Sequence, residues 1–148
     1  MPFFDSYSTS SAASPSLSAP EAPANAPYFY MEKNGEKFLT EVKGCTLADD
    51  LHPGIGLFPD APTERGVKHL HELTKAAKEG YHTAIAFVIQ MNGIHRVLPN
   101  ETAQTEFKKA LVEAAKAGVQ VVCYSCHVKA DSIKITGVIE DTSRFLNM

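Results

Sequence analysis

Two charged residues, Glu41 and Lys43, stand two positions apart in the stretch FLTEVKGCTL, which otherwise has the composition of a buried β-strand. Because a strand alternates its two faces, both side chains point to the same side of the sheet. A carboxylate at such a place can bind Mg²⁺, and a neighbouring lysine can activate a water or stabilise developing negative charge. The same spacing also fits a structural ion pair, and metal-assisted phosphodiester hydrolysis calls for at least one further carboxylate. The spacing alone leaves both interpretations open.

A second group of charged side chains follows in the next amphipathic segment. Arg65, Lys68 and His69 fall within about one helical turn. Together with Lys43 they would form a local patch for the phosphates of a nucleic acid. The alternative is a solvated helix face stabilised by pairs such as Glu64–Lys68. The chain has no Trp and no aromatic residue among these charges, so stacking on bases is not expected.

A third motif, CYSCH from Cys123 to His127, has the spacing of a c-type haem attachment site. It lies inside an apolar β run, where Cys123 and Cys126 differ by three positions and therefore face opposite sides. No second Cys/His pair at zinc spacing accompanies it. We therefore predict buried, unreactive thiols here and no haem or zinc.

The pattern of apolar residues predicts the elements that must position these groups. Two β-rich runs flank Asn34-Gly35 and predict a hairpin with strands over about 28–32 and 37–43, because both turn residues tolerate positive φ. The run AIAFVIQM is typical of a strand buried on both faces. Helices are expected over about 60–79, with Asp60 as N-cap, and over about 102–117. VQVVCYSC predicts another strand, and SIKIT an edge strand.

The expected order is therefore β-β-α-β-α-β-β, an α/β fold in which a mixed sheet is flanked by helices. Glu41 and Lys43 lie near the carboxyl end of the second predicted strand, where sites gather in such sheets. A long Gly- and Pro-containing loop follows and separates them from the first helix. Connections of this length inside a compact domain are usually functional.

Composition limits the class of protein. Residues 1–27 are mostly Ser, Ala and Pro without Lys or Arg, and we expect a disordered leader, followed by one domain over 28–137 and a tail over 138–148. The net charge of −3 argues against a bulk nucleic-acid binder, so any such binding needs a local basic patch. Three cysteines, no signal-peptide pattern and no apolar run long enough to span a membrane favour the cytoplasm or another reducing compartment.

The stretch EVKGCTLADD…LFPDAPTERGVKHLHEL, from Glu41 to Leu73, resembles the sugar fermentation stimulation protein family, and the resemblance extends over about 29–135. The family carries E-V-K-x-x-T-L at a strand end and F-P-D-A-x-T-E-R-G-x-K-H-L at the start of a helix. It is regarded as a DNA-binding family linked to sugar metabolism. The resemblance implies a PD-(D/E)XK nuclease-like lobe in which Glu41 is the metal ligand and Lys43 the catalytic lysine.

The sequence departs from the family pattern in two places. The leader stands where the family has an OB-like lobe, and Tyr28 stands where the family has an aspartate on the first strand. A tyrosine does not replace a carboxylate as a Mg²⁺ ligand at neutral pH. Asp49, Asp50 or Asp60 would have to supply the missing ligand, although Asp60 is predicted to cap the helix. The metal site is therefore expected to be incomplete.

Three hypotheses about function follow. The first is a DNA-binding domain with an incomplete nuclease-like metal site, in which Lys43, Arg65, Lys68 and His69 contact phosphates without sequence preference. The second is an active Mg²⁺-dependent nuclease or phosphodiesterase that uses Glu41 and Lys43. The third is a truncated fragment without independent activity. Whether the chain is an enzyme is left undecided by the sequence.

Overall fold

A computed structural model describes residues 28–100, 102 and 105–139. The elements follow in the order β1 (Tyr28–Lys33), β2 (Glu36–Cys45), β3 (Leu47–Ala48), β4 (Ile55–Phe58), α1 (Glu64–Lys78), β5 (His82–Ile89), β6 (Arg96–Pro99), α2 (Thr105–Lys116), β7 (Gln120–Val128) and β8 (Ile133–Ile139). Five strands form one sheet in the order β1-β2-β5-β7-β8, and three short strands form a second in the order β3-β4-β6.

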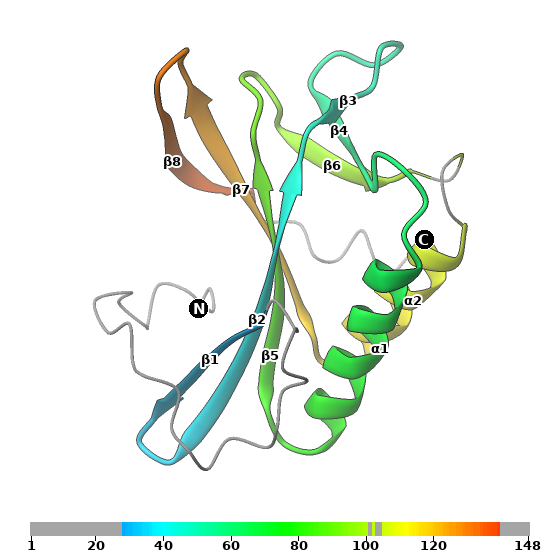
Figure 1. The fold of residues 1–148 in the computed structure, drawn as a ribbon, viewed down its shortest axis with the longest axis vertical. Helices are drawn as coiled ribbons and strands as arrows, with labels where there is room; N and C mark the ends of the chain where they lie inside the picture. Colours follow the sequence, from blue (N-terminus) through cyan, green and yellow to red (C-terminus); the bar gives the residue numbers. More distant parts are fainter. Residues whose placement is uncertain (1–27, 101, 103–104, 140–148) are drawn as a thin grey trace.

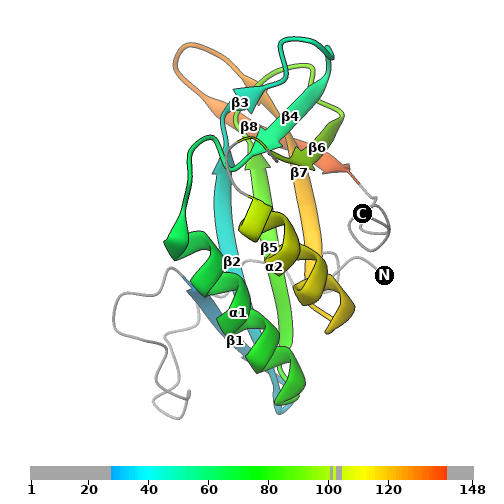
Figure 2. The same ribbon diagram turned by 90° about the vertical axis from the view of Figure 1, so that its right-hand side faces the viewer.

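The larger sheet is mixed, as the sequence predicts. Strands β2, β5 and β7 run parallel, while β1 and β8 are antiparallel edge strands. Both helices pack on the same face of this sheet, and the small sheet lies beyond the helices, near the carboxyl ends of β2 and β5 (Figures 1 and 2). The predicted α/β class with a mixed sheet and two helices is confirmed.

The β1–β2 hairpin fixes the register around Glu41. Its turn residues Asn34 and Gly35 have φ values of 52° and 78°, the left-handed conformations that the Asn-Gly pair predicts. The pairing that follows places Tyr28 directly opposite Glu41. Because facing residues of paired strands point to the same side, both side chains lie on the face that the helices cover.

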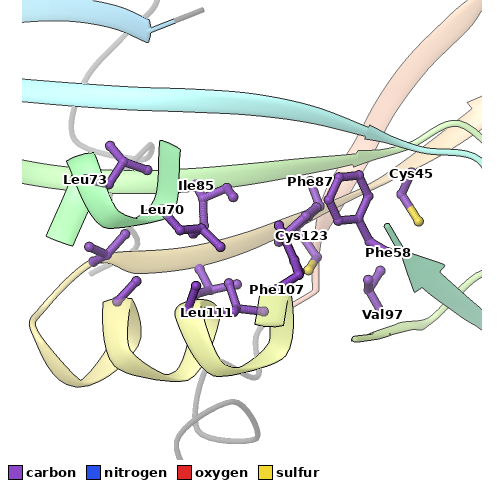
Figure 3. Close-up of a cluster of buried hydrophobic side chains, with 14 of the residues drawn as sticks. Cys45, Phe58, Leu70, Leu73, Ile85, Phe87, Val97, Phe107, Leu111 and Cys123 are labelled. Atoms are coloured by element: carbon purple, nitrogen blue, oxygen red, sulfur yellow. The ribbon is translucent and has the colours of Figure 1, made fainter. Parts of the chain in front are cut away.

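The core fills the space between that face and the two helices. Leu70 and Leu73 of α1 and Phe107 of α2 are 0% exposed and pack with the inward side chains of β5 (Figure 3). Phe58 of β4 joins this cluster, with its ring centroid 4.9 Å from Phe87 and 5.1 Å from Phe107. Burial of each such side chain contributes roughly 1.5 to 3 kcal/mol. The small sheet is therefore anchored to the main core through Phe58.

The structure differs from the expected elements mainly between the hairpin and the first helix. Part of the predicted loop forms β3 and β4, and β4 pairs in parallel with β6. Strands of two and four residues are too short to show a periodicity, and their partners are distant in sequence. Strand β2 also continues to Cys45, because its parallel pairing with β5 extends that far. Glu41 is therefore in the middle of β2, and the prediction that it lies at the strand end was wrong.

The start of the first helix also differs from prediction. Thr63, not Asp60, is the N-cap of α1, since its hydroxyl accepts the N–H of Gly66 at 2.9 Å. Helix α2 spans Thr105–Lys116 in the described structure, within the helix predicted over about 102–117.

The predicted leader over 1–27 lies outside the described residues, as does all but the start of the predicted tail over 138–148. Within the described part of the chain, no helix has the length and apolar character needed to cross a membrane.

Candidate functional site

Glu41 is a charged residue in the hydrophobic core. Its side chain is 0% exposed, and its neighbours across the sheet are Tyr28 on β1 and Ile85 on β5. Removing a carboxylate from water is unfavourable unless charged or hydrogen-bonding groups compensate for it. The contacts of Glu41 with β2 and α1 provide this compensation.

One oxygen of Glu41 binds two nitrogen atoms. Lys43 Nζ lies 2.7 Å from Oε1, and His69 Nδ1 lies 2.6 Å from the same oxygen. Because a carboxylate only accepts, His69 donates its Nδ1–H to Glu41. Lys43 Nζ and His69 Nδ1 are 3.5 Å apart. The three side chains therefore form one compact cluster that joins β2 to α1, which we call the Glu41 cluster.

The second oxygen of the Glu41 carboxylate differs from the first in its contacts. Oε2 is buried and has no hydrogen-bond partner among the described residues. An unsatisfied buried acceptor is unfavourable and calls for an explanation in a native structure. A ligand or ion that reached this atom would gain a contact.

Tyr28 and Glu72 border the Glu41 cluster. The Tyr28 hydroxyl donates to Glu72 Oε2 at 2.5 Å and lies 3.3 Å from the carbonyl oxygen of His69. Its ring packs edge-on against the imidazole of His69, with centroids 5.6 Å apart. Burial, and then the hydrogen bond to Glu72, hold the pKa of the Tyr28 hydroxyl far above its ordinary value. Tyr28 is thus a neutral donor beside two carboxylates.

The predicted phosphate-binding residues fall into two groups. Lys43 is partly exposed, with 18% of its side chain accessible, and it contacts His69 of α1. His69 is buried and bonded to Glu41, so it positions the cluster and does not present itself to solvent. Arg65 and Lys68 are exposed on α1, and Lys68 lies 3.9 Å from Glu72. Arg65 is four residues before His69 and therefore lies on the same side of the helix, one turn nearer its start.

The side chains around Glu41 do not fit a divalent cation held by the protein. Nowhere in residues 28–100, 102 and 105–139 do three His, Cys, Asp or Glu side chains form a group that could hold a metal ion. Lys43 already balances the charge of Glu41, and Tyr28 occupies the facing position. Of the loop carboxylates considered from sequence, Asp49 accepts from His52 and from the N–H of Leu51.

The other two loop carboxylates do not complete the site either. Asp50 and Asp60 are both exposed. Neither joins Glu41 in a group of ligands among the described residues. The described structure therefore brings none of these three loop carboxylates together with Glu41.

The cysteines are free and buried. Burial raises the pKa of Cys45 to about 11 and that of Cys123 to about 12, and it also raises the pKa of Cys126. A thiol with a raised pKa is a poor nucleophile and a poor metal ligand at neutral pH.

The structure brings Glu41, Lys43 and His69 together, all three singled out from the sequence, whereas sequence reasoning missed the contact of Glu72 with Tyr28. Glu72 stands three residues after His69, so the two share one side of α1. That spacing was the available signal. The hydrogen bond from Tyr28 depends on how the hairpin approaches the helix, which no local pattern encodes.

Comparison with known proteins identifies the group of relatives. The family model described as the sugar fermentation stimulation protein RE domain matches residues 28–132. The chain belongs to the sugar fermentation stimulation protein family. A homologue from Desulfitobacterium hafniense (strain Y51) is 47% identical over 106 residues, which cover 72% of this chain and 45% of that protein. A homologue from Clostridium beijerinckii is 46% identical over 112 residues, which cover 76% of this chain and 48% of that protein.

Among solved structures, SfsA of Pyrococcus furiosus in complex with Ca²⁺ superposes with a TM-score of 0.68 at 24% identity. The match covers 74% of this chain and 47% of that one. This chain thus spans about half the length of the family members it matches. The shared part contains the Glu41 cluster, Tyr28 and Glu72.

Proposed function

We propose that this domain binds DNA through the phosphate backbone, using Lys43, Arg65 and Lys68, and that its nuclease-like metal site is incomplete. The observation that carries the proposal is the position of Lys43. Its ammonium group is held by a buried carboxylate, yet part of the side chain reaches solvent beside α1. A fixed, partly exposed cation next to a basic helix is suited to a phosphate group.

The charge on α1 supports this proposal. The helix carries four basic and two acidic side chains, a net charge of +2, in a chain whose total is −3. A local excess of positive charge attracts a polyanion even when the whole molecule is slightly acidic. Binding that depends on few phosphate contacts is of modest affinity and weakens as salt rises.

The experiment measures duplex affinity by fluorescence polarisation over a series of salt concentrations. Three phosphate contacts predict a slope of about −2.7 for log K against log salt. Replacing Arg65 or Lys68 with Ala should each reduce the magnitude of the slope by about 1. Lys109→Ala is the matched control, since Lys109 is an exposed lysine on α2 that pairs with Glu106. Absence of binding at low salt, or affinity that does not fall with salt, would refute the proposal.

A metal-dependent nuclease is the alternative function, and two observations favour it. Glu41 Oε2 is buried without a partner in the described structure, and the solved archaeal relative is a Ca²⁺ complex. In that case Glu41 would hold Mg²⁺ and Lys43 would serve the attacking water. Cleavage of plasmid DNA with Mg²⁺ or Mn²⁺ that disappears in Glu41→Gln and Lys43→Ala would establish this function. A pure preparation that cleaves with neither ion would exclude it.

A further inference from the structure

The position beside Glu41 that a cation would need is bordered by groups that oppose one. Lys43 stands 2.7 Å from Glu41 Oε1, so a divalent ion on the adjacent Oε2 would face an ammonium group at short range. Like charges so close together repel strongly in a buried site, where screening by water and salt is weak. A single carboxylate already neutralised by lysine offers little compensation for dehydrating the ion.

The second carboxylate near this position, that of Glu72, contacts other side chains. Glu72 accepts from the Tyr28 hydroxyl through Oε2 and lies near Lys68 through Oε1. Tyr28 and Glu41 are directly opposed across β1 and β2, and the Tyr28 ring packs against His69. The phenol therefore lies on the same side of the sheet as Glu41 and holds Glu72 by a hydrogen bond. A neutral phenol donates a hydrogen bond here, whereas a cation requires an acceptor.

We propose that Tyr28 keeps this site free of divalent cations, so that phosphate groups bind here through Lys43 and the basic side chains of α1 without a bridging metal ion. The phenol lies opposite Glu41 on the paired strand, packs against His69 and uses Glu72 as its acceptor. A carboxylate at position 28 would face Glu41 across β1 and β2 and add a second negative charge that offsets the ammonium group of Lys43, with Oε2 of Glu41 available as a ligand. One substitution, Tyr28→Asp, should therefore create a cation site from residues that are already in place. The statement about phosphate rests on the proposed DNA binding, while the statement about cations does not.

Calorimetric titration with Ca²⁺ and Mn²⁺ tests the statement about cations. The purified chain and Tyr28→Phe, which keeps the ring but not the hydroxyl, should show no saturable binding that depends on Glu41. Tyr28→Asp should bind one ion per chain, with a rise in thermal midpoint on adding Ca²⁺. Adding Glu41→Gln to Tyr28→Asp should abolish both the ion binding and the rise in thermal midpoint. Circular dichroism of each variant checks that the fold is kept.

Two results would overturn the inference. The first is saturable binding of one ion by the unsubstituted chain, if this binding is lost in Glu41→Gln. The electron paramagnetic resonance signal of Mn²⁺ measures this binding. This measurement needs no variant at position 28 and decides the matter even if Tyr28→Asp does not fold. The second is a folded Tyr28→Asp variant that gains no cation binding, because the phenol would then not be what excludes the ion.

Duplex binding in EDTA and in Ca²⁺ at equal ionic strength separates this inference from the proposed function. Equal affinity in both solutions supports the inference. Affinity that requires Ca²⁺ and is lost in Glu41→Gln overturns it while leaving DNA binding intact. If the duplex binds in neither solution, the proposed function is refuted. The cation titration then still decides the role of Tyr28.

Discussion

Replacing Lys43 with Met should destabilise the domain far more than replacing an ordinary surface lysine. Methionine keeps most of the length and the apolar stem but removes the ammonium group that lies 2.7 Å from Glu41 Oε1. Glu41 is 0% exposed and its Oε2 has no partner among the described residues, so His69 alone would remain to compensate the buried charge. Removing one member of a buried ion pair costs about 3 to 5 kcal/mol.

The assay is urea and thermal unfolding followed by circular dichroism. A loss of this size corresponds to a fall in Tm of more than about 10 °C for a domain near 100 residues. Glu41→Gln should cost less, because the lysine left behind reaches solvent. The double variant Glu41→Gln/Lys43→Met should recover much of the loss, and the resulting cycle gives the coupling energy of the pair.

Lys109→Met is the control, because Lys109 pairs with Glu106 at 3.5 Å while both side chains are about two-thirds exposed. Exposed pairs contribute little to stability, so its Tm should hardly change. The reasoning is refuted if Lys43→Met and Lys109→Met shift Tm equally. It is also refuted if the double variant is no more stable than Lys43→Met, since Glu41 would then not be the charge that Lys43 compensates.

Four further predictions concern the cap, the core and the thiols. Thr63→Ala removes the hydroxyl that accepts from Gly66 and should cost about 0.5 to 2 kcal/mol in urea unfolding. Phe107→Ala empties a 0% exposed site and should cost about 3 to 5 kcal/mol by the same measurement. Cys45 and Cys123 have pKa values raised by burial to about 11 and about 12, so native protein at pH 8 should resist iodoacetamide, as read by mass spectrometry. Because the unfolded chain releases these protons near pH 9 while the folded chain keeps them, stability should fall as pH rises above 9.

Each of these has a result that would contradict it. Thr63→Ser retains the acceptor, and a loss as large as that of Thr63→Ala would assign the effect to the methyl group. Phe107→Leu keeps most of the volume, so a loss equal to that of Phe107→Ala would argue against a cavity. Rapid labelling of Cys45 in the folded protein, at the rate seen in denaturant, would contradict its burial.

The sequence was sufficient for the parts of the fold that depend on local chemistry. Asn34-Gly35 predicted the hairpin because few residue pairs accept two positive φ angles, and the continuous apolar run of β5 predicted a central strand. The long motif that begins at Glu41 was specific enough to indicate the family. Where several residues compete for one role, prediction was weaker. Thr63 and Asp60 both suit an N-cap, and only the bond to Gly66 distinguishes them.

The state of the site was decided by the tertiary structure. The spacing of Glu41 and Lys43 placed both on one face, but it did not show that His69 would share the same oxygen or that Oε2 would be left over. Nor did it show that Tyr28 would donate to Glu72, forty-four positions away. Residue type and spacing determine which groups can meet on a strand or a helix, because these elements repeat regularly. Which groups do meet depends on how β1, β2 and α1 pack, since contacts between distant segments are set by the whole core.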